Sequence, residues 1–239
     1  MWLGENGIDG APESVAALRD AGHTVAFCTN NSSELVSFYE EKLAAFGIPA
    51  AGAVVSSAMA AASLLRAGER VLVCAGHGAR EAVTAAGAVE VSDGLVDTVL
   101  VGFHTTFDYA AMNRAVRAVL VGARLVATND DPIYPAADGP SPGCGAILAS
   151  IERATGQRAL IAGKPHEAMA ALIHAAYGED GVFVGDSLDT DGAMADVLGW
   201  RFGLVLSGNT TAAMVPETRS ADWVAADLRS LVARHLALP

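Results

Sequence analysis

The most informative segment for the fold is Val182-Phe183-Val184-Gly185-Asp186-Ser187-Leu188-Asp189-Thr190-Asp191. An apolar, strand-like run is followed directly by three carboxylates, which predicts a strand with an acidic loop at its carboxyl end. Open α/β sheets bind ligands at these strand ends. One interpretation is an ordinary acidic turn. The other is a cation site, because carboxylates so close together repel one another. Mg²⁺ is the natural candidate, with Asp186 as a ligand and Asp191 as an indirect or water-mediated partner.

A second polar segment, Thr29 to Ser33, follows another apolar run at Val25 to Phe27. Such residues favour a helix cap. Five polar residues in a row also suit phosphate binding by Thr29, Asn30 and Asn31, with the positive end of the following helix adding to the attraction. Lys164, after the apolar run Leu160 to Ala162, is either a solvent-facing lysine or a cation that neutralises phosphate charge.

Strand-like and helix-like segments alternate along the chain, which predicts an α/β fold with a parallel sheet. Helices are expected from Pro12 to Gly22, around Leu35 to Phe46, and near 57–67, 80–86 and 146–155. Strands are expected at 23–29, 71–75, 98–103, 124–128 and 160–163. The segment Asn129 to Gly145 holds four prolines and reads as a long loop, which in a compact domain is usually functional. We place an inserted domain at 68–162, within a core of 1–67 and 163–239.

Composition excludes several classes of protein. The net charge is -12, with 15 Lys and Arg against 27 Asp and Glu, so a nucleic-acid partner is not expected. No apolar run reaches the roughly 18 residues of a membrane span, and the N-terminal residues resemble no export signal.

Cys28, Cys74 and Cys144 have no metal-ligand spacing and are expected to be buried, reduced thiols of a cytoplasmic protein. His77, His104 and His166 lie in separate loops, which does not favour a zinc site.

Together these segments resemble the haloacid dehalogenase superfamily, and specifically its NagD-like phosphatases with a large α/β cap. The family's second, third and fourth motifs match Thr29-Asn30-Asn31-Ser32-Ser33, Lys164-Pro165 and Gly185-Asp186 through Thr190-Asp191. The cap is matched by segments that include Val101-Gly102-Phe103, Ala127-Thr128-Asn129 with Asp131-Pro132, and Pro142-Gly143-Cys144-Gly145. The resemblance covers essentially the whole chain.

The resemblance implies a Rossmann-like core with an inserted α/β cap, and magnesium-dependent hydrolysis of a small phosphate monoester through an aspartyl-phosphate. Phosphate would be held by Thr29, Asn30 and Asn31, Lys164 would be catalytic, and Asp186 and Asp191 would form the metal site. Three cap residues are candidates for substrate specificity: Asn129, Asp131 and Tyr134. A second interpretation of Tyr134 is that its ring packs under the loop. Caps of this kind often help to form dimers in relatives, so a homodimer through the cap is one expectation from the resemblance, and the sequence leaves the oligomeric state open.

The chain departs from the family's pattern at its start. Members open with a strand that ends in Asp-x-Asp-Gly, whereas this sequence begins where that motif would have ended, and Asp9-Gly10 does not replace it. As written, the chain is expected to be inactive, through N-terminal truncation of a working phosphatase. The alternative is a natural pseudo-phosphatase that binds a phosphorylated ligand or a protein. A third reading, a response-regulator-like domain, leaves the cap and Lys164-Pro165 unexplained.

Overall fold

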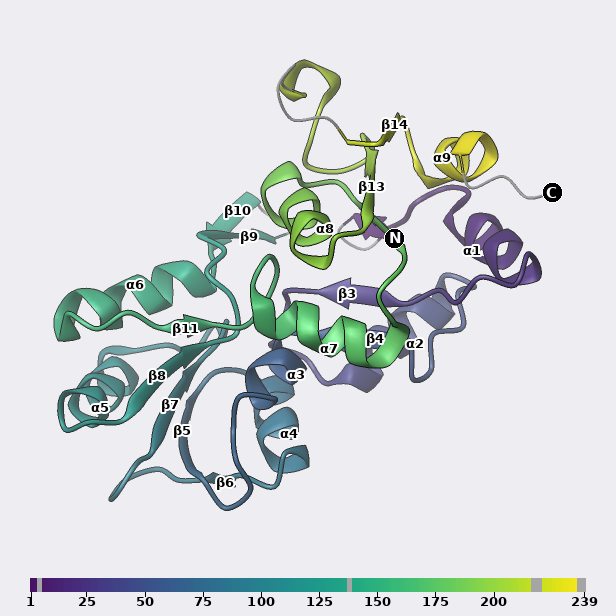
Figure 1. Ribbon diagram of the computed structural model, residues 1–239. Coiled ribbons are helices and arrows are strands. Elements are labelled where there is room, and N and C mark those ends of the chain that lie inside the picture. Colours follow the sequence, from purple (N-terminus) through teal and green to yellow (C-terminus); the bar gives the residue numbers. More distant parts are fainter. Residues whose placement is uncertain (4–5, 137–138, 216–220, 236–239) are drawn as a thin grey trace. The chain divides into compact units, whose positions relative to one another are not determined.

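The computed structural model describes residues 1–3, 6–136, 139–215 and 221–235. It divides into two compact units, which are described separately. Unit 1 contains residues 1–27, 40–53 and 164–239, and unit 2 contains residues 28–39 and 54–163. The α/β fold class is confirmed (Figure 1). The predicted inserted domain at 68–162 is defined from the sequence and stays a prediction.

Unit 1 contains a parallel three-stranded sheet in the order β12-β13-β14, with helix α8 contacting β12 and β13 and helix α9 contacting β13 and β14. Its elements are β1 (Trp2–Leu3), β2 (Asn6–Gly7), α1 (Ala11–Asp20), α7 (Glu167–Tyr177), β12 (Val182–Gly185), the π-helix η1 (Leu188–Gly192), α8 (Ala193–Leu198), β13 (Arg201–Val205), the 3₁₀-helix η2 (Ala212–Met214), β14 (Trp223–Ala225) and α9 (Leu228–His235). The predicted strand at Val182 to Val184 is thus confirmed, and its carboxyl end leads directly into Asp186.

Unit 2 contains a parallel five-stranded sheet in the order β11-β8-β7-β5-β6. Its elements are β4 (Val54–Ser56), α3 (Ser57–Ala62), β5 (Arg70–Cys74), α4 (His77–Ala85), β6 (Val89–Glu90), β7 (Thr98–Val101), α5 (Tyr109–Leu120), β8 (Arg124–Ala127), β9 (Ile133–Ala136), β10 (Gly139–Pro142), α6 (Cys144–Thr155) and β11 (Leu160–Ile161). Two elements, β3 (Phe27–Thr29) and α2 (Val36–Ala45), have residues in both units.

Two sequence-based expectations need correction. The predicted strand at 23–29 is only Phe27–Thr29, because its partner β4 offers three residues for pairing. The predicted loop at 129–145 contains the antiparallel hairpin β9–β10, in which Tyr134 faces Ser141. Prolines disfavour strands in general but are tolerated in a two-stranded hairpin, where each strand has a free edge. Residues 137 and 138 of that segment lie outside the described residues.

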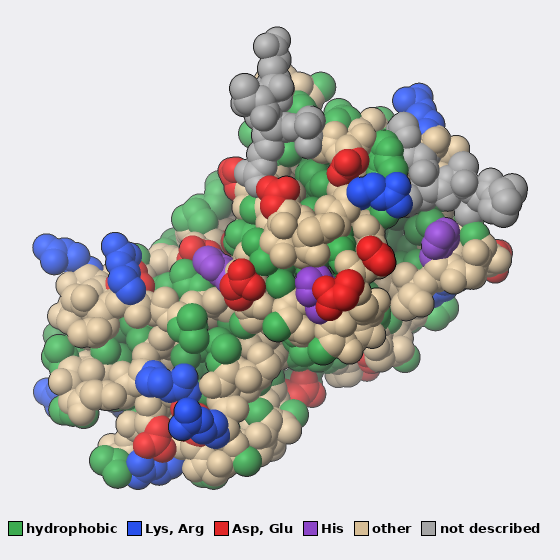
Figure 2. Space-filling view, in the orientation of Figure 1, with side chains coloured by type: hydrophobic (Ala, Val, Ile, Leu, Met, Phe, Trp, Pro, Cys, Tyr) green, Lys and Arg blue, Asp and Glu red, His purple; other side chains and the backbone are tan. Residues whose placement is uncertain are grey.

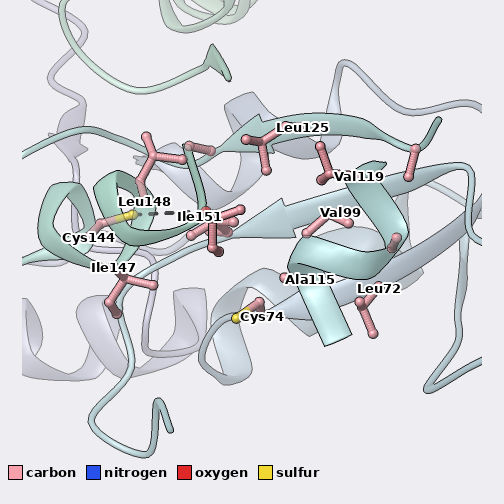
Figure 3. Close-up of a cluster of buried hydrophobic side chains, with 14 residues drawn as sticks. Leu72, Cys74, Val99, Ala115, Val119, Leu125, Cys144, Ile147, Leu148 and Ile151 are labelled. Carbon is pink, nitrogen blue, oxygen red and sulfur yellow. Dashed lines mark hydrogen bonds between the residues drawn. The ribbon is translucent and has the colours of Figure 1, made fainter. Parts of the chain in front are cut away.

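The core of unit 2 lies where α5 and α6 pack together and cover the parallel sheet (Figure 3). It includes Leu72 of β5, Val99 and Val101 of β7, and Ile147 and Ile151 of α6. Figure 3 shows Cys74 and Cys144 among the side chains of this cluster. Both thiols are buried, as expected from the sequence, while Cys28 is half-buried.

The two buried thiols give a prediction for alkaline stability. Burial raises the pKa of Cys74 and of Cys144 from 9.0 to about 11. Above pH 9 the unfolded chain therefore loses these protons while the folded chain keeps them, which favours unfolding. Between pH 8 and pH 10 we expect each thiol to lower the free energy of unfolding by about 1 kcal/mol. Urea denaturation should show a Cys144→Ala variant losing about 1 kcal/mol less over this range than the wild type, and equal losses would contradict the prediction.

Candidate functional site

Two side-chain oxygens of the polar segment Thr29 to Ser33, in unit 2, accept hydrogen bonds from within the segment. Thr29 is the last residue of β3, and its Oγ1 accepts a hydrogen bond of 3.1 Å from the backbone N–H of Asn31. Asn31 Oδ1 accepts two bonds from Ser33, 3.0 Å from the backbone N–H and 2.7 Å from the hydroxyl. These bonds fold the segment into a tight turn in which Thr29, Asn30 and Asn31 are all half-buried.

The backbone carbonyls of this segment also have donors. The Asn30 carbonyl accepts from Ser57 Oγ at 2.6 Å and from Asn129 Nδ2 at 2.7 Å. The Asn31 carbonyl accepts from the Tyr39 hydroxyl at 3.1 Å. Burial raises the pKa of Tyr39, so its hydroxyl stays protonated and remains a donor under ordinary conditions.

The segment therefore presents donors rather than acceptors. The Thr29 oxygen already receives an N–H, so the Thr29 hydroxyl proton points toward a different acceptor. Asn31 Oδ1 is occupied, and the Asn31 Nδ2 group donates to no residue of the described part of the chain. Hydrogen-bond donors without opposing acceptors suit an anion, and hydrogen bonds to charged oxygens are the stronger kind.

Two of the three predicted specificity residues lie beside this segment. Asn30 Nδ2 donates to Asp131 Oδ2 at 3.1 Å, and Asn129 Oδ1 accepts from the backbone N–H of Asp131 at 3.2 Å. Gly163 lies against the same group of residues. A Cβ atom at this position would lie 2.5 Å from the Thr128 carbonyl oxygen and 2.7 Å from Asn30 Oδ1. A residue with a side chain would push these groups apart.

The third predicted specificity residue, Tyr134, packs its ring on Phe103. The ring centroids are 4.6 Å apart and the planes are inclined by 18°, which is a stacked arrangement. Tyr134 is half-buried in β9, so its position is set by the hairpin and by this contact. The observed contact of the Tyr134 ring is therefore a packing contact, as in the second interpretation of this residue from the sequence. A role of Tyr134 in substrate specificity stays a prediction.

A cavity of about 410 Å³ opens in unit 2 at the carboxyl ends of β5 and β7. In the sheet, β6 lies on one side of β5, and β7 followed by β8 lies on the other side. The connections that leave β5 and β7 therefore run in opposite directions, and open α/β sheets bind ligands at such a point. The lining includes Ser33, Cys74, His77, Phe103, His104, Thr105 and Thr106, together with four charged residues: Glu34, Arg80, Asp108 and Arg114. The lining contains both positive and negative side chains, and Arg80 is paired with Glu90. The charges of the lining therefore favour neither an anionic nor a cationic ligand.

In unit 1, Lys164 and Asp191 form a buried ion pair. Lys164 Nζ lies 2.6 Å from Asp191 Oδ1, and the two side chains are 12% and 7% exposed. Asp191 Oδ2 accepts from the backbone N–H groups of Asp186 and Ser187, both at 3.1 Å. Gly185 allows this approach, because a Cβ atom there would lie 2.2 Å from Asp191 Oδ2. Both oxygens of Asp191 are therefore engaged by the protein.

Asp186 is half-buried, and its Oδ1 atom accepts no hydrogen bond from the residues that the structure describes. Its Oδ2 accepts from the backbone N–H of Asn209 at 2.6 Å, and its carbonyl accepts from Thr210 N–H at 3.0 Å. The Met1 amino group lies near both carboxylates. Burial lowers its pKa, while Asp186 and Asp191 act in the opposite direction.

These carboxylates fit the way in which proteins hold Mg²⁺, with few carboxylates and the remaining ligands from water and phosphate. Asp186 suits direct ligation. Asp191 suits the indirect role, because its oxygens already bind Lys164 and two amides. Within the described ranges, three or more His, Cys, Asp or Glu side chains nowhere gather as a ready-made metal cage.

Three residues that complete these arrangements carry no signal in the sequence: Ser57, Tyr39 and Asn209. Their partners are between 8 and 27 residues away in the chain, in separate elements. On the face drawn in Figure 2, Lys and Arg side chains stand in small groups, some with Asp or Glu beside them. No helix in the described part of the chain has the length and apolar character needed to cross a membrane.

Comparison with known proteins gives matches along most of the chain. Residues 1–89 match the sequence model of haloacid dehalogenase-like hydrolases, and residues 161–231 match a second model, for HAD-like hydrolases. Glycerol-3-phosphate phosphatase of Gallus gallus is 33% identical over 242 aligned residues, which cover 88% of this chain and 78% of the relative.

Solved structures share the fold. Glycerol phosphate phosphatase of Mycobacterium tuberculosis, in complex with calcium, has a TM-score of 0.89 and 32% identity, covering 96% of this chain and 71% of its own; the same protein is also known in complex with magnesium. The p-nitrophenyl phosphatase of Archaeoglobus fulgidus has a TM-score of 0.90 and 29% identity, covering 97% of this chain and 94% of its own.

Proposed function

Because this chain belongs to the haloacid dehalogenase superfamily, in its NagD-like phosphatase subgroup, we propose that it is a magnesium-dependent hydrolase of small phosphate monoesters. One observation carries the proposal most directly. In the segment Thr29 to Ser33, four acceptors already receive hydrogen bonds, namely Thr29 Oγ1, Asn31 Oδ1 and the carbonyls of Asn30 and Asn31, and the segment presents the Thr29 hydroxyl and the Asn31 Nδ2 group as donors. A phosphate oxygen is the kind of acceptor that such a segment is built to receive.

Each group has a role in this proposal. Thr29 and Asn31 donate to non-bridging phosphate oxygens, and Asn30 is held by Asp131 and Asn129. The Lys164 ammonium group, held by Asp191, neutralises charge on the phosphoryl group being transferred. Asp186 would hold Mg²⁺, which when bound neutralises further negative charge on the phosphate. By the family's pattern the reaction would pass through an aspartyl-phosphate, on an aspartate of the opening Asp-x-Asp-Gly motif that this sequence does not contain at its start.

The names of the relatives support a proposal for the substrate class. Two of the proteins compared above are phosphatases of glycerol phosphate, and we propose a small phosphorylated metabolite of this kind, with glycerol 3-phosphate as the first candidate. The proposal also includes an inserted domain at 68–162, a homodimer formed through that domain, and a cytoplasmic location.

The proposal is tested with protein isolated from its native source, so that its own N-terminus is kept and can be identified by intact mass. We expect hydrolysis of p-nitrophenyl phosphate and glycerol 3-phosphate with added Mg²⁺, and loss of this hydrolysis on treatment with EDTA. Saturable binding of glycerol 3-phosphate without turnover would instead support the pseudo-phosphatase. Neither binding nor turnover of any phosphate ester would overturn the proposal.

A further inference from the structure

The carbonyl oxygen of Asn30 accepts two hydrogen bonds from buried side chains outside the segment Thr29 to Ser33. Ser57 Oγ donates at 2.6 Å and Asn129 Nδ2 donates at 2.7 Å. Ser57 is 0% exposed and Asn129 is 3% exposed, so neither bond competes with bulk water. Two buried donors therefore fix the direction of one carbonyl in the proposed phosphate-binding segment.

Fixing this carbonyl also fixes the neighbouring N–H. The Asn30 C=O and the Asn31 N–H belong to the same planar peptide unit, in which a trans arrangement makes them point in opposite directions. That N–H donates to Thr29 Oγ1 at 3.1 Å. With this acceptor position filled, the Thr29 hydroxyl proton is left to point away from the segment. Hydrogen bonds in such a chain strengthen one another.

We propose that Ser57 and Asn129 are positioning residues, which act through the Asn30–Asn31 peptide to aim the Thr29 hydroxyl at a phosphate oxygen. This inference rests on the proposed function. It gives Asn129 a role different from the substrate contact expected from the sequence, because its amide is engaged by Asn30 and by the Asp131 N–H.

The two donors serve the same carbonyl, so either one alone keeps most of the peptide's orientation. Loss of one should therefore have a small effect and loss of both a large one. Since one hydrogen bond is worth about fivefold in an equilibrium, we expect about threefold weaker phosphate binding in Ser57→Ala and in Asn129→Ala. In the double variant we expect binding to be weaker by more than about 20-fold, which exceeds the product of the single effects.

The experiment is isothermal titration of the full-length protein with inorganic phosphate in the presence of Mg²⁺, which needs no turnover. Ser56→Ala is the matched control. Ser56 is 2% exposed and adjacent to Ser57, but its hydroxyl accepts from the Met59 N–H, and no bond to residues 29–33 occurs in the described structure. Phosphate affinity should be unchanged in Ser56→Ala, while thermal unfolding should show similar stabilities for the two serine variants. Ser57→Thr, which keeps the hydroxyl, should recover affinity.

Two results separate this inference from the proposed function. In the first, wild-type protein binds phosphate, Ser57→Ala has the same affinity as Ser56→Ala, and the double variant shows only the product of the single effects. The positioning role is then wrong, and the proposed function stands. If wild-type protein does not bind phosphate, both are overturned. Should Asn129→Ala fail to fold, Asn129→Ser takes its place, because a smaller polar side chain removes the amide donor and leaves a smaller void.

Discussion

Replacement of Asp191 by alanine is expected to lower the free energy of unfolding by about 3–5 kcal/mol. The carboxylate binds the Lys164 ammonium group at 2.6 Å and also accepts the backbone N–H groups of Asp186 and Ser187. Its removal takes away the carboxylate that lies against the buried Lys164 ammonium group, and it also takes away the acceptor of two backbone N–H groups. Urea denaturation at pH 7 measures the loss.

The control for this prediction is Asp180→Ala, which removes an exposed carboxylate between α7 and β12 and should change stability by less than about 0.5 kcal/mol. A second variant, Lys164→Met in the Asp191→Ala background, removes the buried positive charge that Asp191 balances in the wild type and should recover part of the stability. A loss below about 1 kcal/mol in Asp191→Ala would show that the buried pair contributes little.

Asp186→Asn in the full-length protein is expected to reduce magnesium-dependent turnover by about 10²–10³-fold while the fold persists. Asparagine has nearly the same shape, and its carbonyl oxygen still accepts the Asn209 N–H that Asp186 receives at 2.6 Å. The negative charge, which a hard divalent cation requires, is lost. Steady-state hydrolysis of p-nitrophenyl phosphate is measured as a function of Mg²⁺ concentration, with circular dichroism as the test of folding.

Asp189→Asn is the matched control, because it neutralises an exposed carboxylate three residues further along the same segment. Its turnover and its dependence on Mg²⁺ should stay close to those of the wild type. Unchanged turnover in Asp186→Asn would remove Asp186 from the metal site. An equal loss in both variants would point to the overall charge of the segment rather than to a ligand.

Regular local patterns were readable from the sequence. Pro12 and Gly22 predict a helix that is present as α1, and the apolar run before Asp186 predicts β12. The polar residues after two strands predict where phosphate and metal chemistry would lie. The helix and the strand are confirmed because turn residues, helix caps and apolar runs act within a few positions of one another in the chain, while the phosphate and metal roles stay predictions.

The hairpin β9–β10 could not be predicted in this way. Its segment is rich in proline, and a strand there depends on cross-strand pairing rather than on the preference of single residues. The same limit applies to Ser57, which is an unremarkable helix-start serine in the sequence. Its bond to the Asn30 carbonyl exists only because α3 begins beside the segment after β3.

The family, the α/β class and the residue types available for phosphate and metal binding could be read from short motifs in the sequence. The hydrogen-bond partners of these residues became known only from the folded structure. It showed that both oxygens of Asp191 are engaged by Lys164 and two amides, and that Asn129 holds a carbonyl 99 residues away. Hydrogen-bond partners so distant in the chain are set by packing, and no local pattern of residues records them.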